Sequence, residues 1–251
     1  MAQKVYEKPE LYEIFSSRQD FKKESDFVVK LAKQFKKSKG NSLLNVGCGT
    51  GAHDKFLKKY FDLTGIDLNK KMLELAKKKN PKLTYKIGNM KSFSFSQKFD
   101  VITALTGVMS YNHSYKELKN TLTNLYKHLE KGGILVFNWA VVKEVAFEKG
   151  KIKNYVKVDT ISRKDLDCVV IDNAYDPNRN DTTIETNVIF LIRKNRGPLK
   201  IVVDKHLLGL FELKKVRKIL REIGFKCHLY ENDFSGEKYK MLGPIFVCLK
   251  S

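Results

Sequence analysis

Three glycines, Gly47, Gly49 and Gly51, stand at every second position, directly after the largely apolar segment 43–46. Glycine has no Cβ and tolerates positive φ, so a turn of this kind lets the main chain approach a ligand closely. In α/β proteins, a buried strand that leads through such a turn into a helix forms one side of a nucleotide-sized crevice. The spacing therefore indicates a nucleotide site, although glycine turns without a ligand are also common.

A carboxylate and an amide follow at the ends of the next two expected strands. Asp67 comes about twenty residues after the first glycine, where a carboxylate of a doubly wound fold accepts hydrogen bonds from both ribose hydroxyls. Asn89 and Met90 follow Gly88 further along the same edge, and a polar side chain next to an apolar one suits an adenine ring. The alternative for Asp67 is that it only caps the helix that follows it.

Helical and extended segments alternate through the first half of the chain. Asn69 is an N-cap residue, and Asn80 and Pro81 end the helix that it begins. Strands that alternate with helices of this length indicate βαβ units and a parallel sheet. We therefore predict an α/β, doubly wound, Rossmann-like fold with helices at 52–60, 69–80 and 115–129 and strands at 62–67, 83–87, 99–105 and 134–139.

A different pattern begins near residue 151, where apolar and polar residues alternate with period two up to residue 208. Turn sequences at 176–178 and 196–198 separate the extended segments. We predict an inserted antiparallel β subdomain at 151–205, between the fifth strand and the last helix. A helix at 212–223 and strands at 225–230 and 245–249 then return to the first unit, so that residues 1–150 and 206–251 form one domain.

The composition is that of a folded chain with a strongly basic surface. The 251 residues are 42% hydrophobic, and the formal net charge is +20, carried by 41 lysines and seven arginines. Lysine at helical spacing favours solvated helix faces, whereas attraction of RNA or of an anionic small molecule is the functional alternative. The four cysteines have no metal-ligand spacing, so we predict no metal site and reduced thiols of a cytoplasmic protein. The sequence has neither an 18-residue apolar run nor the apolar core of a signal peptide.

The motifs together resemble those of the class I S-adenosylmethionine-dependent methyltransferases. The matching segments are 44–51, 65–68, 88–90 and 99–102, while the fourth glycine of the dehydrogenase pattern is absent, which argues against NAD. The resemblance implies a seven-stranded sheet, the cofactor S-adenosyl-L-methionine and its product S-adenosyl-L-homocysteine. The cofactor-binding residues that it implies are Asn45, Gly47, Cys48, Gly49, Thr50, Gly51, Asp67, Leu68, Asn89, Met90 and Leu105. This chain departs from the family at Asn45 and Asn89, where acidic residues are usual, so we expect binding to survive in a weaker form.

A closer resemblance lies outside the cofactor motifs. The N-terminal residues 9–15, with Gln19, Asp20 and Glu24, are similar to the lid of methyltransferases that act on small amines, and we expect residues 1–38 to form a helical lid. Segments 107–111, 206–211 and 234–236 are similar to those of the dTDP-amino-sugar N,N-dimethyltransferases. In that subfamily the β insertion contributes to the acceptor site and to the subunit contact. The resemblance thus implies a small-molecule acceptor, such as an anionic nucleotide-sugar, and a homodimer.

Methyl transfer to an amine needs a nucleophile held about 3 Å from the methyl carbon in a dry pocket, and a Tyr or His that orients the lone pair or collects the proton. By resemblance, Tyr12 is the first catalytic candidate, followed by His113 and His206, and Arg18 is a candidate contact of the cofactor carboxylate. The alternatives are helix packing for Tyr12, an exposed loop position for His113 and a structural contact for His206.

Two other functions stay open from the sequence. An RNA methyltransferase fits the basic charge, but segment 103–106 lacks the Asn/Asp-Pro-Pro-aromatic motif of enzymes that methylate base amines, so a nucleic-acid substrate is disfavoured. A non-catalytic S-adenosylmethionine-binding module fits the substitutions at Asn45 and Asn89. We expect methyl transfer to the amine of a nucleotide-linked amino sugar or of a similar small molecule.

Overall fold

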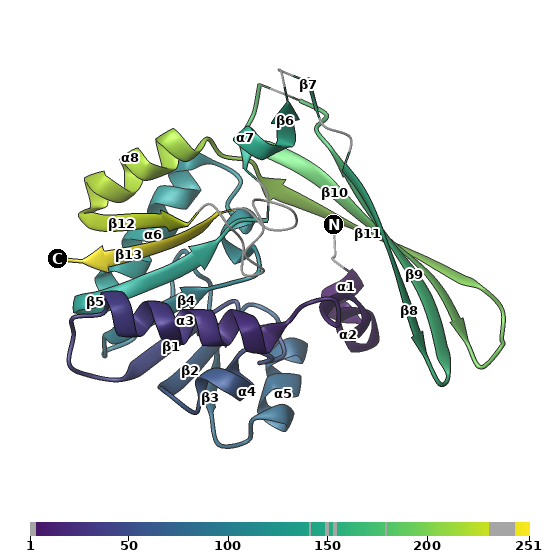
Figure 1. Ribbon diagram of the computed structural model, residues 1–251, viewed down its shortest axis with the longest axis horizontal. Helices are drawn as coiled ribbons and strands as arrows, with labels where there is room; N and C mark the ends of the chain where they lie inside the picture. The colour runs from purple at the N-terminus through teal and green to yellow at the C-terminus, as the bar shows by residue number, and fades with distance from the viewer. Residues whose placement is uncertain (1–3, 141, 149–150, 153–154, 179, 231–243) are drawn as a thin grey trace.

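The computed structural model describes residues 4–140, 142–148, 151–152, 155–178, 180–230 and 244–251. Figure 1 shows a layered α/β body with a long twisted sheet projecting from one side. None of the helices in the described ranges is long and apolar enough to cross a membrane.

The body is built around a seven-stranded sheet of order β12-β13-β5-β4-β1-β2-β3. Strands β1 to β5 run parallel, while β13 is antiparallel to β5 and β12 is antiparallel to β13. The strand bounds are Ser42–Val46 (β1), Asp62–Asp67 (β2), Thr84–Ile87 (β3), Phe99–Ala104 (β4), Leu129–Asn138 (β5), Phe225–Tyr230 (β12) and Ile245–Lys250 (β13). The predicted doubly wound, seven-stranded architecture is confirmed.

Helices cover both faces of this sheet because its inner strands are apolar on both sides. Leu43 of β1 packs with α3 (Phe21–Phe35) and α4 (Asp54–Leu57) on one face. Leu44, its neighbour, packs with α6 (Tyr115–His128) and α8 (Leu213–Ile223) on the other, as expected from the period of two. Helix α5 (Lys70–Lys79) contacts β2 and β3. This packing fixes the carboxyl ends of β1 to β4 at one edge.

The projecting sheet is the predicted insertion, an antiparallel sheet of order β11-β10-β9-β8. Its strands are β8 (Tyr155–Arg163), β9 (Leu166–Tyr175), β10 (Thr183–Lys194) and β11 (Lys200–Gly209), so it extends four residues beyond the predicted boundary at 205. The lid helices α1 (Lys4–Glu7) and α2 (Pro9–Ser16) lie between this sheet and the body (Figure 1). Val5, Leu11 and Ile14 pack there against Val170 and Phe190. Short elements η1 (Val108–Tyr111), α7 (Lys143–Ala146), β6 (Phe147–Glu148) and β7 (Lys151–Ile152) complete the described chain.

Three local predictions differ from the structure. Helix α4 covers only four residues of the predicted helix 52–60. Strand β5 begins at Leu129 rather than Ile134, and its pairing with β4 shifts register between the Phe99–Leu129 and Val101–Ile134 pairs. The expectation of four reduced thiols is wrong, since Cys227 and Cys248 form a disulfide, whereas Cys48 and Cys168 are free and buried. Cys227 and Cys248 are direct partners in the β12–β13 ladder, a pairing that depends on strand register and not on sequence spacing.

Candidate functional site

A cavity of about 510 Å³ lies at the carboxyl ends of the parallel strands, and we call it the strand-end cavity. Its floor is the glycine turn, and its sides come from the segments that follow β2, β3 and β4. Tyr6, Tyr12 and Phe15 of the lid helices close over it. The volume is typical of a site for a small molecule or cofactor.

The glycine turn has the backbone that the sequence predicts. Gly47, Gly49 and Gly51 have φ values of +66°, +53° and +68°, a region that residues with a Cβ rarely adopt. A Cβ on Gly49 would lie 2.8 Å from the hydroxyl oxygen of Tyr12, and one on Gly47 would lie 2.6 Å from Cγ2 of Val108. The absence of these Cβ atoms lets Tyr12 and Val108 pack directly against the backbone of the turn.

Asp67 ends β2 beside this turn and is held by the backbone. Its Oδ2 accepts a hydrogen bond from the Gly49 N–H at 2.9 Å, and its Oδ1 accepts one from the Asn69 N–H at 2.8 Å. Burial raises the pKa of Asp67 above its usual value, although these two N–H groups act in the opposite direction. The carboxylate therefore faces the strand-end cavity in a fixed orientation with lone pairs left for a further donor.

Asn45 has a structural environment that the sequence did not predict. Its Nδ2 donates to Oδ1 of Asp54 at 2.6 Å, and its Oδ1 accepts from the Thr103 hydroxyl at 3.0 Å. Tyr85 donates to the other oxygen of Asp54 at 2.8 Å. Asp54 is fully buried, and burial raises its pKa against the effect of these donors. An acidic group is thus present at this end of β1, but on α4 instead of at position 45.

The predicted cofactor residues divide into two groups by position. Eight of them line the strand-end cavity: Asn45, Gly47, Cys48, Gly49, Asp67, Leu68, Met90 and Leu105. Thr50 and Gly51, at the end of the glycine turn, do not line the strand-end cavity. Asn89 does not line it either, because its side-chain oxygen accepts a hydrogen bond from the Lys91 N–H at 2.9 Å and is used in a local turn.

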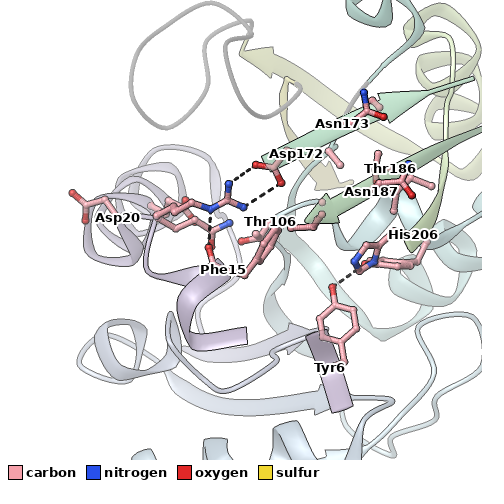
Figure 2. A pocket seen from close by; sticks show the side chains of 18 of the residues that line it. Tyr6, Phe15, Asp20, Thr106, Asp172, Asn173, Thr186, Asn187 and His206 are labelled. Carbon is pink, nitrogen blue, oxygen red and sulfur yellow. Dashed lines mark hydrogen bonds and ion pairs between the residues drawn. The ribbon is translucent and has the colours of Figure 1, made fainter. Parts of the chain in front are cut away.

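A second cavity, of about 420 Å³, lies between the lid, the segment after β4 and the inserted sheet, and we call it the insertion cavity (Figure 2). It shares Tyr6, Phe15, Gln19, Thr106 and Tyr111 with the strand-end cavity. The two cavities therefore meet at these residues. Thr106 has φ +58°, and its buried hydroxyl has no hydrogen-bond partner within the described part of the chain. Strained, unpaired groups of this kind cluster at functional sites.

The predicted catalytic residues lie in three different places. Tyr12 lines the strand-end cavity and His206 the insertion cavity. His113 lines neither cavity, because its Nε2 donates to the Leu207 carbonyl at 3.0 Å and holds the segment after η1 against β11. Its place outside both cavities gives no support to a catalytic role. The predicted segment 234–236 lies outside the described residues.

Arg18 lines the insertion cavity and not the strand-end cavity, so its predicted contact with a cofactor carboxylate stays a prediction. Its guanidinium pairs with Asp159 at 2.9 Å and with Asp172, and it lies 4.5 Å from the centre of the Phe15 ring. Burial acts to raise the pKa of Asp159, but hydrogen bonds from Lys157 and Arg18 outweigh it and lower that pKa. The two carboxylates come from β8 and β9, so sequence order did not bring them near position 18.

Sequence reasoning missed Tyr6 and Tyr111 as site residues. Their hydroxyls are 2.8 Å apart at the junction of the two cavities, and the Tyr111 hydroxyl lies 3.0 Å from Nδ1 of His206. Nε2 of His206 lies 3.0 Å from Oδ2 of Asp204. The sequence signals were the resemblance of segments 107–111 and 206–211, which contain Tyr111 and His206, and the period of two that puts Asp204 and His206 on one face of a strand. Nothing in the sequence places Tyr6 beside them.

Comparison with known proteins agrees with this geometry. Residues 43–133 match the family described as a methyltransferase domain. The chain is 24% identical over 230 residues to dTDP-3-amino-3,4,6-trideoxy-alpha-D-glucopyranose N,N-dimethyltransferase of Streptomyces venezuelae, covering 90% of this chain and 93% of that protein. It is 34% identical over 125 residues to dTDP-4-amino-2,3,4,6-tetradeoxy-D-glucose N,N-dimethyltransferase of Saccharopolyspora spinosa, covering 49% of this chain and 50% of that protein. The crystal structure of DesVI of Streptomyces venezuelae superimposes with a TM-score of 0.83 at 23% identity, covering 96% of this chain and 97% of that one.

Residues 43–133 therefore form a methyltransferase domain, and the sheet order and the superposition show the Rossmann-like fold of the class I S-adenosylmethionine-dependent methyltransferases. Over nearly its whole length the chain resembles a dTDP-amino-sugar N,N-dimethyltransferase.

Proposed function

We propose that this protein transfers methyl groups from S-adenosylmethionine to the amine of a nucleotide-linked amino sugar or a closely similar small amine. The observation that carries the proposal is the junction of the strand-end and insertion cavities at Tyr6, Phe15, Thr106 and Tyr111. A donor and an acceptor bound in adjoining cavities would meet in a space closed by the lid. The near-full-length similarity to amino-sugar N,N-dimethyltransferases supports the same acceptor class.

The strand-end cavity fits the cofactor. Asp67 would accept hydrogen bonds from the ribose hydroxyls. Met90 and Leu68 would contact the adenine ring, and the backbone of residues 47–49 would lie against the methionine part of the cofactor. S-adenosylmethionine carries its methyl group on a sulfonium. An amine can attack the methyl carbon and displace the neutral thioether of S-adenosylhomocysteine without metal assistance. The residues of this chain then have to orient the amine, exclude water and take up a proton.

The insertion cavity suits a cationic group. Its described lining includes the carboxylates of Asp20, Glu24 and Asp172 and the cations of Arg18 and Lys23. Arg18 pairs with Asp172, and Oε2 of Glu24 lies 2.6 Å from Nε2 of His53. This acidic balance contrasts with the net charge of +20 of the chain and favours an ammonium-bearing acceptor. We propose that the anionic part of a nucleotide-sugar would lie toward the basic surface outside this lining.

The test is binding followed by turnover. Calorimetry with S-adenosylmethionine is expected to give one site per chain, and mass spectrometry is expected to detect methylated product from dTDP-3-amino-3,4,6-trideoxyglucose or dTDP-4-amino-2,3,4,6-tetradeoxyglucose. Binding without turnover on any amine would support the non-catalytic module instead. Methylation of total RNA in preference to every amine would support the RNA methyltransferase.

We propose further that the inserted sheet forms a homodimer contact through its outer face. Val158, Ile171, Ile189 and Val203 are aligned across the four strands on that face, and Val158 and Ile201 are 60% and 63% exposed. An apolar face of this extent is typical of an interface between protein chains. Light scattering is expected to give a dimer for the native chain and a monomer for Ile201→Glu; a monomeric native chain would contradict the contact.

A further inference from the structure

Four side chains form one continuous hydrogen-bonded chain beside the junction of the two cavities. Asp204 lies 3.0 Å from Nε2 of His206, and Nδ1 of His206 lies 3.0 Å from the Tyr111 hydroxyl. The Tyr111 hydroxyl lies 2.8 Å from that of Tyr6. Figure 2 shows Tyr6 and His206 close to each other at one end of the insertion cavity. Asp204 and His206 are buried, at 1% and 7% exposure.

The protonation states of Asp204 and His206 set the direction of the other hydrogen bonds in this network. If Asp204 is ionised and His206 is neutral, the Nε2–H of His206 donates to Asp204 and Nδ1 accepts. The single hydroxyl proton of Tyr111 then points to His206, and Tyr6 must donate its own proton to Tyr111. The oxygens of Tyr6 and Tyr111 consequently present only lone pairs to the cavities. They suit an N–H donor and oppose an acceptor-only group such as a carboxylate.

We propose that Tyr6, Tyr111, His206 and Asp204 form a proton relay that deprotonates the ammonium group of the acceptor before methyl transfer. An N–H bond of the ammonium breaks, and its proton goes to the Tyr111 oxygen while the Tyr111 proton passes to Nδ1 of His206. The electron pair stays on nitrogen as the lone pair that attacks the methyl carbon. The resulting imidazolium is balanced by Asp204. This inference rests on the proposed amine acceptor and names the groups that make the amine reactive.

Tyr111 is the relay member between acceptor and histidine and is not the final base. Burial raises the pKa of Tyr111, and nearby acidic groups add to the shift, among them Asp204 and Asp67. Burial also raises the pKa of Tyr6 and of Tyr12, which is the other phenol packed against this group. A tyrosinate is therefore disfavoured here, so that a proton which reaches Tyr111 must move on to His206.

The lid helix α1 holds this relay together. The N–H of Val5 donates to Oδ2 of Asp204 at 3.0 Å, and the Tyr6 ring lies edge-on to His206 with their centres 5.8 Å apart. The carbonyl of Tyr6 accepts from Nδ2 of Asn69 at 3.0 Å, two residues after the proposed ribose ligand Asp67. Packing of α1 over the strand-end cavity and assembly of the relay thus depend on the same four residues, 4–7.

The first test is the pH dependence of turnover in Tyr111→Phe, which breaks the relay but keeps the ring. With dTDP-3-amino-3,4,6-trideoxyglucose, kcat is expected to fall about 10- to 100-fold at pH 7. The deficit is expected to shrink below about threefold near pH 9.5, where the amine loses its proton to solvent. His206→Gln should behave in the same way. The matched control is Tyr60→Phe, at a surface tyrosine that is 46% exposed.

If kcat of Tyr111→Phe is reduced by the same factor at every pH, or is not reduced at pH 7, the relay is overturned. A packing role of Tyr111 would not depend on the protonation of the acceptor. Calorimetry is expected to show S-adenosylmethionine affinity within about twofold of the native protein for both tyrosine variants. Failure of the native protein to methylate any amine would instead contradict the proposed function.

The second test needs no acceptor. In ¹⁵N-histidine-labelled native protein with S-adenosylmethionine, the His206 signal, assigned by its loss in His206→Gln, is expected to report a neutral ring protonated at Nε2. Asp204→Asn is expected to change this signal, whereas the signal of His228, which stacks on Phe35, should stay unchanged. A ring protonated at Nδ1 would overturn the relay.

Discussion

The side-chain amide of Asn45 donates a hydrogen bond to the buried carboxylate of Asp54 at 2.6 Å. Related methyltransferases usually carry an acidic residue at the end of the first strand, whereas this chain places the acid nine positions later, at the start of α4. Tyr85 and Asn45 together donate to both oxygens of Asp54. Asn45 is therefore matched to Asp54, whose buried carboxylate supplies an acidic group at this end of β1.

This pair predicts that Asn45→Asp destabilises the protein in a pH-dependent way. Two buried carboxylates at this distance raise the folded-state pKa of the pair, so the native state binds more protons than the unfolded state. Stability should then fall as pH rises from 5 to 7.5, and at pH 7.5 the loss should be about 1–3 kcal/mol. Urea unfolding at the two pH values measures it. Asn178→Asp, at an exposed turn, is the control; an equal effect of both substitutions would argue against coupling to Asp54.

Asp67→Ala is expected to weaken S-adenosylmethionine binding at least tenfold. A hydrogen bond between a charged group and a buried partner contributes about 1.5–3 kcal/mol, and the carboxylate also fixes the Gly49 N–H. Calorimetry measures the effect, with Asp62→Ala at the exposed start of the same strand as control. Unchanged affinity in the Asp67 variant would exclude it as the ribose ligand.

Arg18→Met distinguishes between two roles of Arg18, the predicted contact with the cofactor carboxylate and the ion pairs with the inserted sheet. Because Arg18 pairs with Asp159 and Asp172, its loss should lower stability by about 1–3 kcal/mol and raise the acceptor KM, with cofactor affinity unchanged within about twofold. The pKa of Asp159 is lowered in the folded state, so this pairing stabilises at neutral pH and is lost on acidification. The difference in the free energy of unfolding between Arg18→Met and the native protein should therefore become smaller at acidic pH. Arg217→Met on α8 is the control. A large loss of cofactor affinity in Arg18→Met would support the predicted contact of Arg18 with the cofactor carboxylate.

Tyr12→Phe tests whether this residue acts on turnover or on packing. The Tyr12 hydroxyl lies over the Gly49 position of the turn, on the cofactor side of the junction. We expect kcat to fall by about tenfold or more, with a smaller change in S-adenosylmethionine affinity. Steady-state kinetics and calorimetry on the same preparation compare the two. A loss of affinity that exceeds the loss of kcat would mean that Tyr12 only packs against the cofactor.

Several parts of the site could be predicted from local sequence because their geometry is local. The turn at Gly47, Gly49 and Gly51 requires positive φ at each position, and Asp67 ends a strand next to β1. Parallel strands in a doubly wound sheet bring such positions to one edge. Asn89 also follows a strand at this edge, but its side-chain oxygen accepts a hydrogen bond from the Lys91 N–H, a local contact that strand order does not predict.

The sequence by itself determined the order of strands and helices, the inserted sheet and the position of the cofactor crevice, since periodicity and glycine spacing act over a few residues. Only the tertiary structure decided which distant side chains meet. It paired Arg18 with the inserted sheet, joined Cys227 to Cys248, and brought Tyr6 and Tyr111 to His206 and Asp204. These contacts depend on how the lid packs between the body and the inserted sheet, which is set by burial of Val5, Leu11 and Ile14 against β9 and β10. No local pattern encodes that packing.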